Sequence, residues 1–269
     1  MRDRIDGHRH HRAVTVKIAT WNVNSLKVRL PQVLDWLAEH HPDALCLQEL
    51  KMEDRSFPEA ELAAAGYRAA FVGQKTYNGV AILSLQEPGR VVRNIPGFED
   101  PQKRLVAATI GDLRLVCGYF PNGQAVGSDK FAYKLDWLAA LTDWLATELA
   151  EHPKLVLCGD FNIAPEDRDA HPDWKDEIHV SEPEREAFRR LVALGLTDAF
   201  RLFEQPERAF SWWDYRMMAF RRNFGLRIDH LLVSQALLPA CRACHVDKAP
   251  RKLERPSDHA PVVLELSPT

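Results

Sequence analysis

Short apolar runs alternate along this chain with segments in which apolar residues recur every three or four positions. The short runs are rich in valine, isoleucine and leucine and predict strands. They cover residues 14–20, 44–50, 68–73, 79–84, 105–110, 113–120, 154–160, 210–213, 227–234, 244–249 and 261–266. The segments with the longer period predict helices over residues 28–40, 58–66, 129–150 and 183–194.

Some predicted strands are close enough in sequence to form hairpins, as 105–110 and 113–120 are, whereas others are separated by helices. This mixture predicts an α/β fold with mixed sheets and helices on the outside. No linker rich in glycine, serine or proline divides the chain, so we expect a single domain over residues 14–269. Residues 1–13 are predicted to be a disordered extension, and the polar, acidic stretch 164–181 is predicted to be a surface loop.

The composition is typical of a globular protein, with 269 residues of which 46% are hydrophobic and 27% charged. No run approaches the roughly 18 apolar residues that a membrane helix needs. The start of the chain contains no apolar run that would act as a secretory signal. We therefore expect a cytoplasmic protein that does not bind membranes. Its net charge of −3 argues at first against a nucleic-acid partner, which normally requires a basic surface.

That negative charge is unevenly distributed along the chain. Residues 143–187 hold 4 basic and 13 acidic side chains, a balance of −9, and the remainder totals +6. Each group of basic residues in the C-terminal third is typical of solvated surface, but together they allow a basic strip that binds DNA. These groups are Arg216, Arg221, Arg222 and Arg227, followed by Arg251, Lys252 and Arg255.

Acidic and amide residues interrupt the apolar runs where a strand ends or begins. One such residue is typical of a cap or a turn. Five such sites in one domain predict a cluster, because strand ends gather at one edge of a sheet. Hard oxygen ligands suit Mg²⁺ or Mn²⁺, and a histidine beside an aspartate suits acid–base chemistry. The pattern indicates metal-assisted phosphoryl or phosphodiester chemistry. Its residues are Asn22, Glu49, Asp160, Asn162, Asp229, Asp258 and His259.

Seven short motifs surround these residues and occur in a fixed order. They are WNVNSL at 21–26, LQELK at 47–51, GYFPNG at 118–123, GDFNIAP at 159–165, FSWWDYR at 210–216, GLRIDH at 225–230 and PSDHAP at 256–261. The series resembles bacterial exonuclease III and the apurinic/apyrimidinic endonucleases of base excision repair. No single motif is decisive, but seven in register over residues 16–266 are highly specific.

The resemblance implies a four-layer α/β sandwich in which two mixed β-sheets are flanked by helices. It also implies a Mg²⁺-dependent DNA repair nuclease, for which Mn²⁺ would substitute. Such an enzyme hydrolyses the phosphodiester 5′ to abasic sites and has 3′–5′ exonuclease and 3′-end-processing activity. The implied partner is double-stranded DNA with abasic sites or blocked 3′ ends, bound by a monomer.

The resemblance also implies a role for each residue of the cluster. Glu49 is expected to be the principal Mg²⁺ ligand, with Asn22 beside it. Asp160 is expected to activate or position the attacking water, and Asn162 to orient the site. Asp229 and His259 form a pair in which the imidazole binds the scissile phosphate. Tyr119 is expected to bind the phosphate too. The candidate metal ligands are thus Glu49, Asn22, Asp160, Asn162, Asp258 and His259.

Further residues match the positions that recognise DNA in the same family. Trp212, Leu226 and Ile228 match the lining of the pocket for a flipped-out abasic sugar, which excludes nucleotides that still carry a base. The alternative is that Trp212 belongs to the core. Residues 217–220 provide either an apolar wedge into the duplex or packing under a loop. Backbone phosphates are expected to contact Lys130, Arg216, Arg221 and Arg222.

Other cofactors fit the sequence less well. The segment 241–245 matches the CxxCH pattern of covalent haem attachment, but a cytoplasmic protein would not acquire it. Zinc would need a second pair of ligands. We expect no haem, no zinc and no nucleotide cofactor. Two alternatives stay open for the function: a relative acting on another phosphoester, such as a phosphoinositide or a mononucleotide, and a catalytically silent DNA-binding protein.

Overall fold

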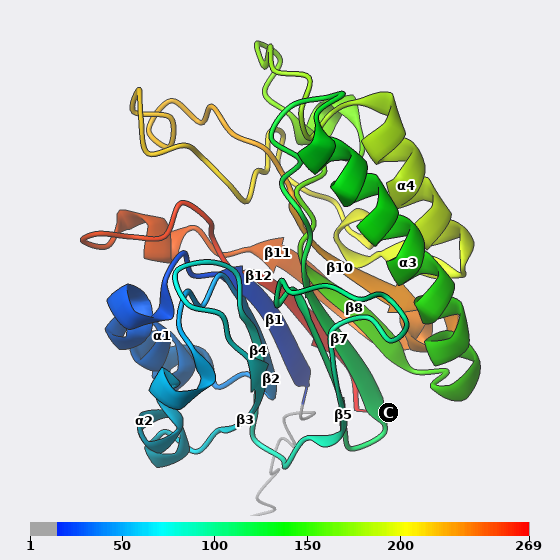
Figure 1. Cartoon of the computed structure of the whole chain (residues 1–269). Helices are drawn as coiled ribbons and strands as arrows, with labels where there is room; N and C mark the ends of the chain where they lie inside the picture. Colours follow the sequence, from blue (N-terminus) through cyan, green and yellow to red (C-terminus); the bar gives the residue numbers. More distant parts are fainter. Residues whose placement is uncertain (1–14, 269) are drawn as a thin grey trace, which may run out of the picture.

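Two six-stranded sheets form the centre of the protein in a computed structural model that describes residues 15–268 (Figure 1). The predicted extension 1–13 lies outside the described residues. The first sheet has the order β11-β12-β1-β2-β4-β3. Its strands are β1 (Val16–Asn22), β2 (Ala44–Gln48), β3 (Arg68–Val72), β4 (Val80–Ser84), β11 (Cys241–Val246) and β12 (Val262–Leu266).

The second sheet has the order β5-β6-β7-β8-β10-β9. Its strands are β5 (Gly89–Arg93), β6 (Leu105–Ile110), β7 (Leu113–Tyr119), β8 (Leu155–Asp160), β9 (Leu196–Asp198) and β10 (Asp229–Ser234). In each sheet one central pair is parallel, β1 with β2 and β7 with β8, and the other pairs are antiparallel. The prediction of mixed sheets is therefore confirmed.

The four α-helices of residues 15–268 cover the outer faces of the sheets (Figure 1). The first pair, α1 (Leu26–His40) and α2 (Glu59–Ala64), packs on the first sheet, and the second pair, α3 (Asp129–Glu151) and α4 (Glu182–Ala193), packs on the second. A third apolar layer lies between the two sheets. These layers confirm the predicted four-layer α/β sandwich. Five short 3₁₀ helices lie between these elements, at Asp54–Ser56, Asp167–Asp169, Ala199–Leu202, Gln235–Ala240 and Ala249–Lys252.

The helix boundaries follow from local capping chemistry. The Ser128 side chain accepts a hydrogen bond from the Phe131 amide at the start of α3. Ser181 and Glu184 form a reciprocal capping box at the start of α4. Both arrangements satisfy amide groups that would otherwise lack partners in the first helical turn. All four predicted helices are present, and their ends differ from the predicted ones by no more than a few residues.

Two strand predictions are wrong. Residues 210–213 form only isolated bridges, from Trp212 to Leu226 and to His259, because this backbone runs through the loops at the edge of the sheets. The strand predicted at 244–249 lies at 241–246, since it is a half-exposed edge strand with a weak apolar pattern. The predictions also missed β5 and β9, which are edge strands with few buried side chains.

No helix among residues 15–268 has the length and apolar character needed to cross a membrane. The helices of this part of the chain lie instead against the two sheets, and their apolar faces are covered there.

Candidate active site

The ends of six strands meet at one edge of the sandwich and bring most of the predicted site residues together. Asn22 ends β1, Glu49 follows β2, Tyr119 ends β7 and Asp160 ends β8. Asp229 begins β10, directly opposite Asp160 in the antiparallel register. His259 precedes β12 and is linked to the first sheet, because the Trp21 indole donates to its carbonyl oxygen over 3.3 Å.

Two carboxylates and an imidazole converge at this edge. One ligand atom from each of Glu49, Asp160 and His259 lies within 4.8 Å of the others. Asn22 joins the two acids, because its side-chain Nδ2 donates to Glu49 Oε2 over 2.7 Å and to Asp160 Oδ2 over 2.9 Å. Carboxylate oxygens this close together repel each other unless a cation or a proton lies between them. The oxygen atoms of Glu49 and Asp160 therefore fit a divalent cation, which prefers oxygen ligands.

A buried Asp–His pair stands beside these carboxylates. The Nδ1 atom of His259 lies 2.8 Å from Asp229 Oδ2, and its Nε2 lies 3.6 Å from Asp160 Oδ2. Ser211 Oγ donates to Asp229 Oδ2 over 2.7 Å and fixes that carboxylate. Burial alone would lower the pKa of His259, but the carboxylates of Asp229 and Asp160 raise it to about 10. The imidazole is consequently a cation at neutral pH.

The pKa values of two further groups are raised at the same edge. Burial, with the charges of Asp229 and Glu49, raises the pKa of Asp160 to about 7, although His259 and the Asn22 amide oppose this rise. Burial also raises the pKa of Tyr119, and the carboxylates of Glu49 and Asp160 add to this. At neutral pH Asp160 can therefore accept a proton, whereas Tyr119 keeps its own and can donate a hydrogen bond.

Close approach and unusual backbone conformations shape the loops of the site. Glu49 has φ +54° and Asn162 has φ +51°, in the left-handed region that non-glycine residues rarely occupy. Gly159, just before Asp160, has φ +146°, and a Cβ there would lie 1.8 Å from the Gly118 carbonyl oxygen. Only glycine fits at this position, so the close contact of β7 and β8 sets where Tyr119 and Asp160 lie.

Asn162 holds the loop that follows β8. Its backbone N–H donates to Asp160 Oδ1 over 2.9 Å, and its side-chain Nδ2 donates to the Phe120 carbonyl oxygen over 3.0 Å. The Asn122 side chain lies 3.5 Å from Asn162 Oδ1. Asn162 thus links the ends of β7 and β8 and orients the Asp160 carboxylate.

Asp258 lies outside the three-residue cluster, although it was predicted as a metal ligand. Its Oδ2 accepts a hydrogen bond from the Trp212 indole over 2.9 Å, and its Oδ1 accepts one from Asn24 Nδ2 over 3.1 Å. Lys51 in turn donates to Asn24 Oδ1 over 2.6 Å. The predictions gave no role to Asn24, Lys51 or Ser211, although all three lie inside the motifs at 21–26, 47–51 and 210–216.

The three residues predicted to line a sugar pocket are in contact with one another but covered. Leu226 is 0% exposed and Ile228 2% exposed, and Trp212 is half-buried. Trp174, from the loop 164–181, packs on the same cluster. A separate cavity of about 600 Å³ opens on the outer side of Trp212 and Trp174, where Phe224 and Arg222 also line it.

The predicted phosphate contacts lie on both sides of the cluster. Arg216, Arg221 and Arg222 are exposed, and Arg216 forms an ion pair with Asp214. Lys130 is exposed and lines a cavity of about 630 Å³ that reaches Tyr119. These positions allow basic groups to flank a strand bound over the acidic residues.

The segment 217–220 was predicted to be either an apolar wedge into the duplex or packing under a loop, and its residues divide between these two roles. Met217 is 78% exposed and Met218 is 64% exposed, as an apolar wedge would be. Ala219 is buried, and the Phe220 ring packs against Trp213 with centroids 5.0 Å apart. The two methionines therefore project from a loop that the other two residues attach to the domain.

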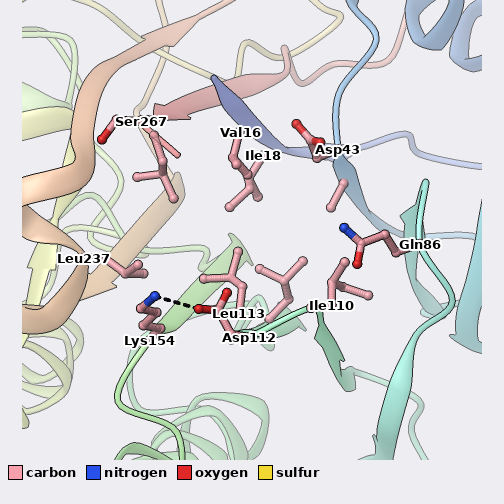
Figure 2. A pocket seen from close by; sticks show the side chains of 14 residues that line it. Val16, Ile18, Asp43, Gln86, Ile110, Asp112, Leu113, Lys154, Leu237 and Ser267 are labelled. Carbon is pink, nitrogen blue, oxygen red and sulfur yellow. Dashed lines mark hydrogen bonds and ion pairs between the residues drawn. The ribbon is translucent and has the colours of Figure 1, made fainter. Parts of the chain in front are cut away.

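A smaller cavity, of about 120 Å³, lies between the sheets at the opposite edge (Figure 2). Val16 and Ile18 at the start of β1 line it, and Lys154 pairs with Asp112 over 2.6 Å at its rim. Because the catalytic cluster lies at the other ends of these strands, this cavity takes no part in the site.

Comparisons with known proteins agree with this geometry. A family model described as the endonuclease/exonuclease/phosphatase family matches residues 19–259. Exodeoxyribonuclease III from Haemophilus influenzae is 36% identical, over 93% of this chain and 99% of its own length.

Two solved structures give the same result. A 3′ phosphatase from Neisseria, bound to a product DNA hairpin, is 49% identical with a TM-score of 0.92, covering 94% of this chain and 99% of that one. An AP endonuclease from Archaeoglobus fulgidus is 39% identical with a TM-score of 0.90, covering 94% of this chain and all of its own. The chain therefore belongs to the endonuclease/exonuclease/phosphatase family, among its members of the exonuclease III and AP endonuclease type.

Proposed function

We propose that this protein is a Mg²⁺-dependent DNA repair nuclease of base excision repair. It hydrolyses the phosphodiester 5′ to abasic sites and removes blocking groups and nucleotides from 3′ ends. The observation that carries this proposal is the convergence of Glu49, Asp160 and His259 on one point, with Asp229 behind the imidazole. The reactions share one chemistry, since each of them breaks the bond between phosphorus and a 3′ oxygen.

The residues of the cluster divide the work of this hydrolysis. A phosphodiester resists attack because its negative charge repels the nucleophile. The cationic imidazole of His259 donates a hydrogen bond to a non-bridging oxygen and stabilises the charge that develops there. Asp229, fixed by Ser211, holds the ring in that orientation.

The attacking water loses its proton to Asp160, since this buried carboxylate lies in the cluster and the charges of Asp229 and Glu49 make it more basic. A bond forms from the water oxygen to phosphorus, the bond from phosphorus to the 3′ oxygen breaks, and the 3′ oxygen takes a proton from solvent water and leaves as a hydroxyl group. Tyr119 donates a hydrogen bond to the phosphate. A Mg²⁺ ion held by Glu49 and Asp160, with Asn22 beside them, would supply Lewis-acid stabilisation of the phosphate charge.

The proposed substrate rests on the surroundings of the cluster and on the relatives. Lys130 and the arginines at 216, 221 and 222 place positive charge on both sides of it. The 3′ phosphatase from Neisseria was solved with a DNA hairpin, and the relative from Archaeoglobus fulgidus is an AP endonuclease. Both support double-stranded damaged DNA as the substrate. Every residue of the cluster comes from one chain, which supports activity as a monomer.

An assay on defined DNA tests the proposal. Four substrates are compared: a duplex with a tetrahydrofuran abasic analogue, a nicked duplex with a 3′ phosphate, an undamaged duplex, and inositol phosphate as a soluble phosphoester. We expect Mg²⁺-dependent cleavage of the two damaged DNAs, no activity with chelator, and no release of phosphate from inositol phosphate. Activity on the soluble phosphoester alone, or on no phosphoester, would overturn the proposal.

A further inference from the structure

A lysine with no exposed surface lies directly behind the candidate active site. Lys134, on the first turns of α3, is 0% exposed, and its only charged partner among the described residues is Glu184 of α4, which is also 0% exposed. Its ammonium group donates to the Asn162 carbonyl oxygen over 2.7 Å and to the Asn122 carbonyl oxygen over 3.2 Å. The pair therefore reaches from the two outer helices to both loops at the site.

A buried ion pair that joins two helices carries a large cost in desolvation free energy. The cost of removing both charges from water is several kcal/mol per ion, and apolar residues of the same volume often stabilise a fold as well or better. The sequence around the pair favours such residues, since Phe131 and Leu138 of the same helix are buried among apolar neighbours. The charges at Lys134 and Glu184 thus point to a purpose other than joining α3 to α4.

The carbonyl oxygen of Asn162 is the atom on which the hydrogen bonds of Lys134 and of its neighbour His179 converge. It accepts hydrogen bonds from Lys134 Nζ and from His179 Nδ1, each over 2.7 Å. Glu184 Oε1 accepts the His179 backbone N–H over 3.1 Å as well as the lysine. Asn162 has φ +51°, a left-handed conformation that asparagine adopts more readily than most residues with a side chain, and these contacts favour it here.

The orientation of Asn162 matters because the other end of the same residue faces the reacting groups. Its backbone N–H donates to Asp160 Oδ1, and its side chain donates to the Phe120 carbonyl oxygen beside Tyr119. The carbonyl and the N–H of Asn162 lie in successive peptide groups that are joined through its φ and ψ angles. A change in these angles would move the N–H away from Asp160 and leave that carboxylate, among the described residues, with only its hydrogen bond from Asn22. A misplacement of about 1 Å is enough to cost an enzyme about 100-fold in rate.

We infer that Lys134, held in place by Glu184, is a positioning residue that fixes the left-handed conformation of Asn162 and thereby the Asp160 carboxylate. It acts through the protein backbone and does not touch the substrate. The part of this inference that concerns kcat rests on the proposed function, whereas the part that concerns the conformation of Asn162 does not.

A second buried ion pair on the same helix provides a matched control. Arg114 of β7 donates to Glu148 near the end of α3 over 2.6 Å, and its side chain is 2% exposed. Its other partners are the Arg90 carbonyl oxygen and Thr109, at the edge of the sandwich far from Asp160. The two pairs have similar burial and share α3, but only the pair of Lys134 reaches the site.

The experiment replaces each pair by methionines, which leaves no unpaired buried charge. The double variants K134M/E184M and R114M/E148M are compared with the full-length wild type on the 3′-phosphate duplex. We expect K134M/E184M to fold, to lose about 10- to 100-fold in kcat and to change KM little. R114M/E148M keeps kcat. The single variant K134M keeps the capping box of Glu184 with Ser181, and it should have the same low kcat as K134M/E184M, so that the loss is not due to the missing cap.

A spectroscopic readout separates this inference from the proposed function. In ¹⁵N-asparagine-labelled protein, the amide resonance of Asn162 should move in K134M/E184M and stay in place in R114M/E148M. If the wild type cleaves neither damaged DNA, the proposed function fails and this resonance alone decides the inference. An unmoved Asn162 resonance, or a kcat of folded K134M/E184M equal to that of R114M/E148M, would overturn it.

Discussion

Trp174 lies edge-on against Trp212, with ring centroids 6.0 Å apart and ring planes at 80°. Both rings pack on Leu226 and Ile228, and Phe224 lies against Trp174 with ring centroids 5.7 Å apart. The Trp174 indole Nε1 is buried and has no hydrogen-bond partner among the described residues. An indole N–H without a partner costs free energy, and this offsets part of what the ring gains by packing on the cluster.

This contact predicts that Trp174 limits the cleavage of abasic sites. A sugar that packs on the side chains of Trp212, Leu226 and Ile228 must first displace the Trp174 ring, and that reorganisation weakens apparent binding. We expect Trp174→Ala to raise the ratio of abasic incision to 3′-phosphate release by roughly 5- to 10-fold. The ratio of the two kcat/KM values measures this change.

The control for this prediction is Tyr77→Ala. Tyr77 is an exposed aromatic residue that lines the cavity beyond Tyr119, on the other side of the cluster. Its loss should change both reactions by the same factor. An unchanged ratio in Trp174→Ala would show that the ring does not govern access to the pocket.

The sequence predicts the arrangement of the strand-end residues because strand periodicity is a local property. Once 44–50 and 154–160 are recognised as buried strands, Glu49 and Asp160 must lie at their ends, and parallel neighbours bring those ends to one edge. The same local reasoning fails for 210–213. Its apolar residues serve two clusters in a loop, with Phe210 and Trp213 in one and Trp212 in the other.

Contacts between segments distant in sequence could not be predicted. Trp174 lies in a polar loop with no periodicity, and nothing near it in the sequence indicates that it covers Leu226. Lys134 lies in an amphipathic helix where a lysine is normally solvated, and its burial depends on Glu184, fifty positions later. Such pairs follow from the packing of α3 against α4, which a pattern along one chain does not encode.

The geometry of the site predicts unequal effects for Asp160 and Asp258, two of the three acidic residues that were predicted to bind the metal. Asp160→Asn removes the base, and we expect kcat to fall by about 100- to 10,000-fold. Asp258→Asn only weakens hydrogen bonds to Trp212 and Asn24, so its cost should be about tenfold or less. Single-turnover cleavage of the abasic duplex measures both, with circular dichroism as the check on folding. Equal losses would show that Asp258 is a metal ligand after all.

The repulsion between Glu49 and Asp160 predicts that the cation also stabilises the fold. Mg²⁺ at about 100 times its Kd should add about 2.7 kcal/mol to the free energy of unfolding, because it binds only the folded protein. Thermal melts with and without chelator test this. Glu49→Gln should remove most of the increase in Tm, whereas Glu53→Gln, an exposed neighbour paired with Arg55, should keep it. An undiminished increase in Glu49→Gln would place the cation elsewhere.

The exposed arginines predict how DNA affinity depends on salt. Each phosphate contact contributes about one unit to the slope of log K against log salt. Arg221→Gln/Arg222→Gln should reduce this slope by about two and weaken damaged and undamaged duplexes alike. Arg216→Gln should change it less, because Asp214 already pairs with that guanidinium. Titrations by fluorescence anisotropy from low to high salt measure the slopes, and an unchanged slope in the double variant would exclude these contacts.

The buried imidazole of His230 predicts a loss of stability in acid. Burial and the adjacent Arg227 guanidinium lower its pKa to about 4, and its Nε2 donates to the Ile163 carbonyl oxygen over 2.8 Å. In an unfolded chain the pKa is about 6.5, so between pH 6.5 and 4 the unfolded state binds a proton that the folded state does not. The free energy of unfolding therefore falls as the pH drops through this window, by about 3 kcal/mol from this group, and the loss is complete below pH 4. His230→Gln keeps a donor for the Ile163 carbonyl oxygen but cannot titrate. Urea unfolding over a pH series should therefore show a shallower fall in the free energy of unfolding than in the wild type.

Part of this fall persists in the variant, because burial lowers the pKa of His179 to about 3, and His179 therefore also destabilises the folded protein as the pH drops. Parallel curves for the two proteins would mean that His230 is already protonated in the folded state.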